Sequence, residues 1–112
     1  MKASKKYGAV IPAIAPTATI KYAGEDSLVK DSLPRVKTWI AQTPQGFEKK
    51  LILAAYQKAI RKGYFTPTDD SGLITNIGRK VKIIPGDYQN IKITFPIDIA
   101  MAEKLIEFRG KE

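Results

Sequence analysis

Three polar residues in this 112-residue chain have the type and position to bind an anionic ligand. Arg35 follows a proline at the start of an expected strand, Thr43 precedes a proline where that strand ends, and Lys92 interrupts an apolar segment. Loops at the carboxyl ends of strands commonly bind ligands in open α/β sheets. Spacing alone favours simpler roles, namely a solvated strand-end arginine, a turn or capping threonine, and a solvent-facing lysine.

The reactions open to this chain are limited because it contains neither histidine nor cysteine. Imidazole catalysis, thiol nucleophiles, disulfides and the usual zinc and iron sites are therefore excluded. Transfer of a phosphoryl or nucleotidyl group onto a phosphate needs no general base, because the nucleophile is already ionised. The protein then supplies positioning and positive charge, which suits a chain with 19 basic and 11 acidic residues.

Two adjacent carboxylates, Asp69 and Asp70, allow two interpretations. They could form a metal-binding pair, or they could begin a helix, where a carboxylate caps free N–H groups and complements the helix dipole. We favour the helix start and expect no metal-binding residue in this chain.

The net charge of +8 raises the question of a nucleic-acid partner. The basic residues are spread along the chain, and their only dense group is Lys2, Lys5 and Lys6. Neither a basic stripe interleaved with aromatic residues nor a known nucleic-acid-binding signature occurs, so we expect no such partner. The sequence has no apolar run of about 20 residues and no signal-peptide region. With the absence of cysteine, this favours a cytoplasmic protein without a membrane partner.

The expected elements follow one another as in a single α/β domain. Apolar runs predict strands, a 3.6-residue period predicts helices, and glycines or prolines separate them. In chain order we expect a strand at 9–14, a hairpin at 17–31, a strand at 35–43, a helix at 45–62, a short helix at 71–78, strands at 80–85 and 90–95, and a final helix from Pro96, capped by Thr94.

The first strand makes this pattern look incomplete. Pro12 and Pro16 predict that it lies at an end or edge of the sheet, because proline cannot donate to a ladder. Trp39 and Phe47 are expected in the core. No element precedes the strand to help cover both its faces, so the chain either dimerises extensively or forms the second half of a larger α/β domain.

Three segments together resemble a known enzyme family. They are WIAQTPQGF at 39–47, TDD at 68–70 and GDYQNIKITFPIDIAMAE at 86–103. Their order and spacing resemble the C-terminal half of 2-C-methyl-D-erythritol 4-phosphate cytidylyltransferase, which joins CTP to methylerythritol phosphate in non-mevalonate isoprenoid biosynthesis and releases pyrophosphate. The segment GAVIPAIAPTATIK at 8–21 is similar to the strand that leads into the protruding arm of that family.

The resemblance implies a fold, a set of substrate contacts and an assembly. The fold is the C-terminal half of a Rossmann-like nucleotidyltransferase, a three-layer α/β/α domain, with residues 14–38 forming a protruding β-hairpin arm that makes a homodimer. Arg35 and Lys92 are expected to hold the substrate phosphate for attack on the α-phosphorus of CTP. Thr19, on the arm, is expected to reach the sugar-phosphate bound by the partner subunit, and Thr43 to lie near the same substrate. A fixed guanidinium, an ammonium and hydroxyl donors suit a phosphate dianion.

The same resemblance implies what this chain lacks. The family's N-terminal half carries the glycine-rich loop for the CTP phosphates, basic residues that stabilise the transition state, and the aspartate that binds Mg²⁺. The glycines here are all isolated. We therefore expect a truncated, split or expressed fragment that is inactive without a separate N-terminal half. The alternatives are a fragment of a ribitol-5-phosphate cytidylyltransferase and a non-catalytic dimerisation module of the same fold.

Overall fold

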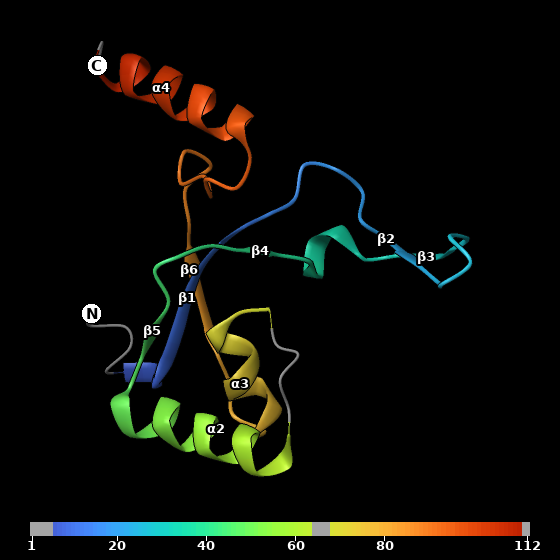
Figure 1. Cartoon of the computed structure of the whole chain (residues 1–112), viewed down its shortest axis with the longest axis vertical. Helices are drawn as coiled ribbons and strands as arrows, with labels where there is room; N and C mark the ends of the chain where they lie inside the picture. The colour runs from blue at the N-terminus through green and yellow to red at the C-terminus, as the bar shows by residue number, and fades with distance from the viewer. Residues whose placement is uncertain (1–5, 64–67, 111–112) are drawn as a thin grey trace.

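A mixed sheet built around strand β1 (Ala9–Ile14) organises the chain. The computed structural model describes residues 6–63 and 68–110. Strand β6 (Lys82–Pro85) pairs with β1 in parallel, whereas β4 (Ile40–Ala41) and β5 (Gly46–Phe47) pair with it antiparallel. Val10 pairs with both β5 and β6, so β5 and β6 occupy opposite edges of β1, and the two lie on either side of it in Figure 1.

The prediction that β1 is an end or edge strand is therefore wrong. The Pro12 carbonyl accepts the Gln42 N–H at 2.9 Å, on the edge of β1 that faces β4 and β5. The N–H and C=O groups of one extended residue point to the same edge, so the position that lacks a donor faces the break between β4 and β5. The Gln42 carbonyl, which would accept from a backbone donor at position 12, accepts instead from the Gln45 side-chain amide at 3.4 Å. The apolar run of β1 is buried, as in a central strand.

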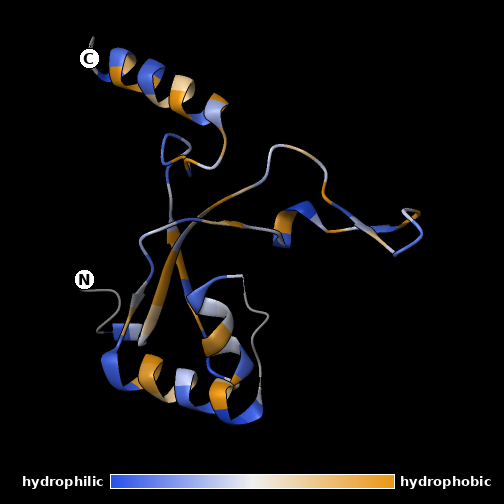
Figure 2. Ribbon diagram, in the orientation of Figure 1, coloured by the Kyte–Doolittle hydropathy of each residue, from blue (hydrophilic) through white to orange (hydrophobic). Residues whose placement is uncertain are grey.

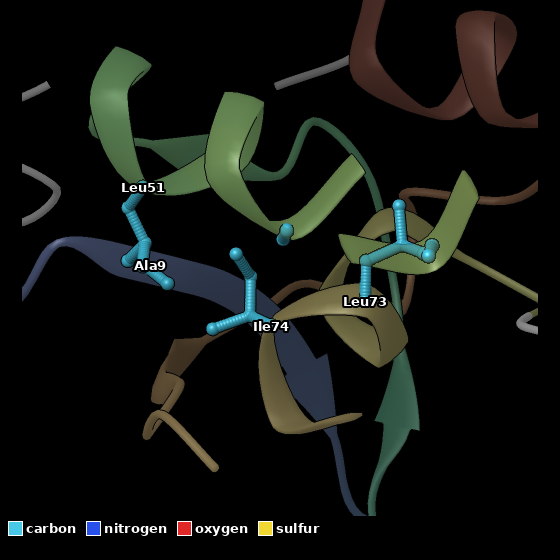
Figure 3. Close-up of a cluster of buried hydrophobic side chains, with 6 residues drawn as sticks. Ala9, Leu51, Leu73 and Ile74 are labelled. Atoms are coloured by element: carbon cyan, nitrogen blue, oxygen red, sulfur yellow. The ribbon is translucent and has the colours of Figure 1, made fainter. Parts of the chain in front are cut away.

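Two helices pack against the sheet and form the main hydrophobic core with it. Helix α2 (Lys49–Lys62) buries Leu51, Ala55 and Ala59 at four-residue spacing, and helix α3 (Asp70–Asn76) adds Leu73 and Ile74. These side chains pack around Ala9 of β1 in Figure 3. The core is thus made by β1, α2 and α3, the three elements whose sequence patterns are clearest.

Helix α2 ends where expected but begins four residues later. Gly63 closes it in the left-handed conformation (φ 65°), and its N–H reaches the carbonyls of Ala59 and Ile60. At the other end, Gly46 and Phe47 pair with β1 as strand β5. The Glu48 N–H then donates to the Gly8 carbonyl at 2.7 Å. Sheet pairing therefore prevails over the helical period in this segment.

A hairpin stands away from the sheet (Figure 1). Strands β2 (Lys21–Ala23) and β3 (Val29–Ser32) pair antiparallel, as the sequence predicts, although both are short and exposed. The prediction of a strand at 35–43 is wrong over its first half, where Arg35–Lys37 form the 3-10 turn η1. The Pro34 carbonyl accepts the Lys37 N–H and the Thr38 hydroxyl, which closes that turn.

The final helix, α4 (Pro96–Gly110), buries none of its side chains. Hydrophobic and hydrophilic residues alternate around it in Figure 2, whereas β1 and β6 are mainly hydrophobic. The Asp98 carboxylate accepts the N–H groups of Thr94 and Phe95, so Asp98 rather than the Thr94 side chain makes the contact at the helix start. These two bonds hold the pKa of Asp98 below its usual value. The prediction of a strand at 90–95 is wrong, because two of its ladder donors are used in this way.

Candidate functional site

The base of the hairpin brings Arg35 and Thr19 together, although they are 16 residues apart. The Leu33 N–H donates to the Ile20 carbonyl at 2.8 Å. This bond aligns the segment that enters the hairpin with the segment that leaves it. Turn η1 begins immediately afterwards, and one terminal nitrogen of the Arg35 guanidinium lies 3.3 Å from the Thr19 hydroxyl oxygen. Both side chains are exposed. A guanidinium beside a hydroxyl offers several donors to one anionic oxygen group.

The other two predicted residues, Thr43 and Lys92, lie on neighbouring loops beside the sheet. Thr43 belongs to the loop between β4 and β5, and Lys92 follows the turn after β6. The Asn90 side-chain amide donates to the Thr43 carbonyl at 2.7 Å and joins these loops directly. Both Thr43 and Lys92 are exposed. Lys92 is not part of a strand, so loop contacts such as this one, and not sheet register, position its segment beside the loop of Thr43.

The two pairs form separate groups within one chain. Over residues 6–63 and 68–110, no hydrogen bond links the Arg35–Thr19 pair to the loops of Thr43 and Lys92. Figure 1 shows η1 and the hairpin extending to one side of the sheet, while the turn after β6 leads up to α4.

An apolar groove runs along the carboxyl ends of β1 and β6. Its lining includes Ile14, Trp39, Ile83, Pro85 and Tyr88. Trp39 is 48% exposed, so its expected place in the core is wrong, and it forms a wall of this groove. Phe47, by contrast, is half-buried against the main core, as the sequence predicts.

The segment between β4 and β5 is fixed on its other side by α3. The Gln45 amide nitrogen donates to the Asp69 carboxylate at 3.0 Å, and its carbonyl oxygen accepts the Ser71 N–H at 3.2 Å. Asp69 also accepts from the Ser71 hydroxyl and the Gly72 N–H, which makes it the N-cap of α3. Partial burial raises the pKa of Asp69, but the bonds from Gln45, Ser71 and Gly72 outweigh it and lower that pKa below its ordinary 3.8.

Asp69 and Asp70 do not fit a magnesium site. Both oxygens of Asp69 accept hydrogen bonds from the protein, and Asp70 accepts the hydroxyl of Tyr56. That bond raises the pKa of Tyr56. Among the described residues, no three acidic side chains converge as a metal-binding group. The helix-start interpretation of this aspartate pair is confirmed.

Acidification should weaken the hydrogen bonds that Asp69 accepts at the start of α3, over a defined pH range. A carboxylate with a lowered pKa in the folded state stabilises the fold above its unfolded value, and this contribution is lost as the pH falls through the folded value. We expect the free energy of unfolding to decline below about pH 4 through Asp69. Asp69→Ala should remove this part of the decline and cost about 0.5–2 kcal/mol at pH 7. Urea denaturation at a series of pH values measures both effects. The control is Glu103→Gln on exposed α4, and an unchanged pH dependence in Asp69→Ala would contradict the assignment.

Sequence reasoning missed three residues that build this site: Gln42, Gln45 and Asn90. Each carries an uncharged amide, and each bonds to groups 24 or more residues away. The sequence signal is that Gln42 and Gln45 stand on either side of Thr43–Pro44. In the structure this peptide bond is cis.

Comparisons with known proteins match this chain along nearly its whole length. A sequence model of the family described as 2-C-methyl-D-erythritol 4-phosphate cytidylyltransferase matches residues 1–108. The chain belongs to this family. The cytidylyltransferase of Caldanaerobacter subterraneus is 47% identical over 103 residues, which are 92% of this chain and 45% of that protein. The cytidylyltransferase of Pelotomaculum thermopropionicum is 43% identical over 109 residues, which are 97% of this chain and 45% of that protein.

Solved cytidylyltransferase structures share the fold. The 4-diphosphocytidyl-2C-methyl-D-erythritol synthase of Anaerococcus prevotii superposes with a TM-score of 0.83 at 40% identity, covering 95% of this chain and 49% of that one. The cytidylyltransferase of Thermus thermophilus gives a TM-score of 0.80 at 33% identity, covering 94% and 51%. This chain thus spans about half the length of the relatives it matches. The predicted fold class, part of a cytidylyltransferase domain, is confirmed. Within the described residues, no helix has the length and apolar composition needed to cross a bilayer.

Proposed function

We propose that this chain is the substrate-binding and dimerisation half of a cytidylyltransferase that transfers CMP from CTP to 2-C-methyl-D-erythritol 4-phosphate. Membership of the family supports the reaction. The observation that carries the proposal is the pairing of the four expected residues, Arg35 with Thr19 and Thr43 with the loop of Lys92. The first pair joins a guanidinium to a hydroxyl, and the second joins the loop of a hydroxyl residue to the loop of a lysine, the donor types that suit a phosphorylated polyol.

The proposed role of the two cations is to hold the attacking phosphate. The nucleophile is a phosphate oxygen that is already ionised, so the chain needs to orient it and reduce its repulsion from the phosphates of CTP. The Arg35 guanidinium offers a planar set of donors, and the Lys92 ammonium offers a point charge. When bound, Mg²⁺ would neutralise charge on the CTP phosphates. We place the CTP and Mg²⁺ sites in the family's N-terminal half, as the family resemblance implies. The acidic pair described above has structural partners and does not suit this role.

The hairpin is proposed to complete the site of a second copy. It stands away from its own sheet, and it exposes apolar side chains at Tyr22, Leu28, Val29 and Leu33. Burial of such residues against a second chain would be favourable. In this arrangement residues 14–38 make the homodimer, and the Arg35–Thr19 pair of one copy faces Thr43 and Lys92 of the other.

Titration calorimetry, sedimentation and an enzyme assay test the proposal together. We expect the 112-residue chain to sediment as a dimer and to bind methylerythritol phosphate more tightly than ribitol 5-phosphate. No pyrophosphate should be released from CTP and methylerythritol phosphate by this chain alone. A monomer that binds neither sugar phosphate would contradict the proposal, and a dimer without ligand binding would favour the non-catalytic module. Preference for ribitol 5-phosphate would reassign the substrate. Pyrophosphate release would show that the CTP site lies within this chain.

A further inference from the structure

The proposed substrate site depends on two loops that are distant in the sequence. Thr43 lies between β4 and β5, whereas Lys92 follows the turn formed by residues 86–90. Neither residue belongs to a helix or strand, so sheet pairing does not fix the distance between them. Other side chains must hold the two loops in register if the hydroxyl and the ammonium are to reach one ligand.

The Gln42 side chain makes this connection with its whole amide group. Its oxygen accepts the Asp87 N–H at 3.1 Å, and its nitrogen donates to the carbonyls of Asp87 at 2.8 Å and Asn90 at 3.1 Å. One acceptor and two donors are thus all used on a single turn. The Gln42 backbone is itself held by β1, through the bond from its N–H to the Pro12 carbonyl.

The turn is shaped to receive this side chain. Gly86 lies so close that a Cβ atom there would be 2.2 Å from the Gln42 side-chain oxygen and 3.1 Å from the Ala13 carbonyl oxygen. Any larger residue would displace the glutamine or the turn, because real side chains do not approach that closely. The Gly86 N–H also donates to the Ala13 carbonyl at 2.9 Å, which ties the start of the turn to β1.

Asn90 completes the link in the opposite direction. Its carbonyl accepts from Gln42, and its side-chain amide donates to the Thr43 carbonyl at 2.7 Å. Each loop therefore donates a side-chain hydrogen bond to the backbone of the other. Lys92 is only two residues beyond Asn90, so these bonds hold the backbone close to it.

We propose that Gln42 is a positioning residue that sets the distance between Thr43 and Lys92. The inference rests on the proposed function, because it assumes that these two residues share a ligand. Gln42 lies outside the core cluster of β1, α2 and α3. Its loss should therefore disturb the loops while leaving that core packed.

The test compares two ligands of different extent by titration calorimetry with the full chain. Methylerythritol phosphate needs both loops, whereas inorganic phosphate needs only the cationic groups. We expect Gln42→Ala to weaken binding of methylerythritol phosphate about tenfold, because three hydrogen bonds that hold the turn are lost. Binding of inorganic phosphate should change less than about twofold. The control is Gln57→Ala on an exposed part of α2, which should leave both affinities unchanged.

The outcomes distinguish a failure of this inference from a failure of the proposed function. If the wild-type chain binds methylerythritol phosphate and Gln42→Ala binds it equally well, Gln42 has no positioning role and the proposed function stands. An equal loss for both ligands would indicate general damage and also overturn the inference. If wild type does not bind methylerythritol phosphate, the proposed function fails and the inference fails with it. Should circular dichroism show that Gln42→Ala is unfolded, Gln42→Glu replaces it. This variant keeps the acceptor but sets an oxygen against two carbonyls, and the same selective loss is expected.

Discussion

Arg35→Ala should weaken binding of methylerythritol phosphate by about 10- to 150-fold, measured by titration calorimetry. The substitution removes a charged donor group whose bonds to a phosphate are worth about 1.5–3 kcal/mol. Arg35→Lys should recover only part of the affinity, because the ammonium keeps the charge but loses the planar set of donors. The Arg35 side chain contributes to no buried core, so the variant should remain folded.

The matched control for Arg35 is Arg61→Ala. Arg61 is an exposed arginine in the last turn of α2 and lies far from Arg35 in the sequence. Its removal lowers the net charge by the same amount, so a general electrostatic effect would reduce both affinities alike. An equal effect of the two variants would contradict a specific phosphate contact at Arg35. Sedimentation of both variants establishes whether any loss of affinity follows a loss of the dimer.

Ile74→Ala should lower the free energy of unfolding by about 2–5 kcal/mol. Ile74 is fully buried at the point where α3 meets β1 and α2, as Figure 3 shows. Truncation leaves a cavity that the surrounding backbone can fill only in part. Urea denaturation followed by circular dichroism measures the change.

Ile60→Ala provides the comparison for the core prediction. Ile60 has the same side chain but is 66% exposed on α2, so its truncation should change the stability by no more than about 0.5 kcal/mol. Similar losses in the two variants would show that α3 does not form the core described here.

The sequence predicts best those elements that are specified locally. Helix α2 has a continuous apolar period and a glycine stop, and α3 has an aspartate N-cap, so both are recognisable from a few neighbouring residues. Strand β1 is an uninterrupted apolar run. The prediction that it lies at an end or edge of the sheet is wrong, because the pattern of one strand does not show which other strands pair with it.

The elements that were predicted wrongly depend on distant partners or on competing local bonds. Alternation at 90–95 is typical of a half-buried strand, but the Asp98 carboxylate takes two of its N–H groups. The helical period extends back to Gln45, but pairing with β1 draws Gly46 and Phe47 into the sheet. In both cases the local pattern is real, and a contact outside the pattern decides the structure.

The candidate site shows the same division. Arg35, Thr43 and Lys92 could be selected by type, and their roles and that of Thr19 came from the family resemblance. The amides that hold the loops could not be found in this way, because glutamine and asparagine carry no charge and their partners are remote in the sequence. A site on loops is positioned by such contacts, and single-sequence patterns do not contain them.

The exposure of α4 implies that the local stability of this helix is lower than that of the sheet. No side chain of this helix is buried, and the described side-chain bond from it to the preceding turn joins Arg109 to Gln89. A segment with so little packing can open while the rest of the molecule remains intact. Its amide hydrogens should therefore exchange with solvent through local fraying, whereas exchange of the β1 amide hydrogens should require global unfolding. We therefore expect helix α4 (Pro96–Gly110) to open and close independently of the sheet.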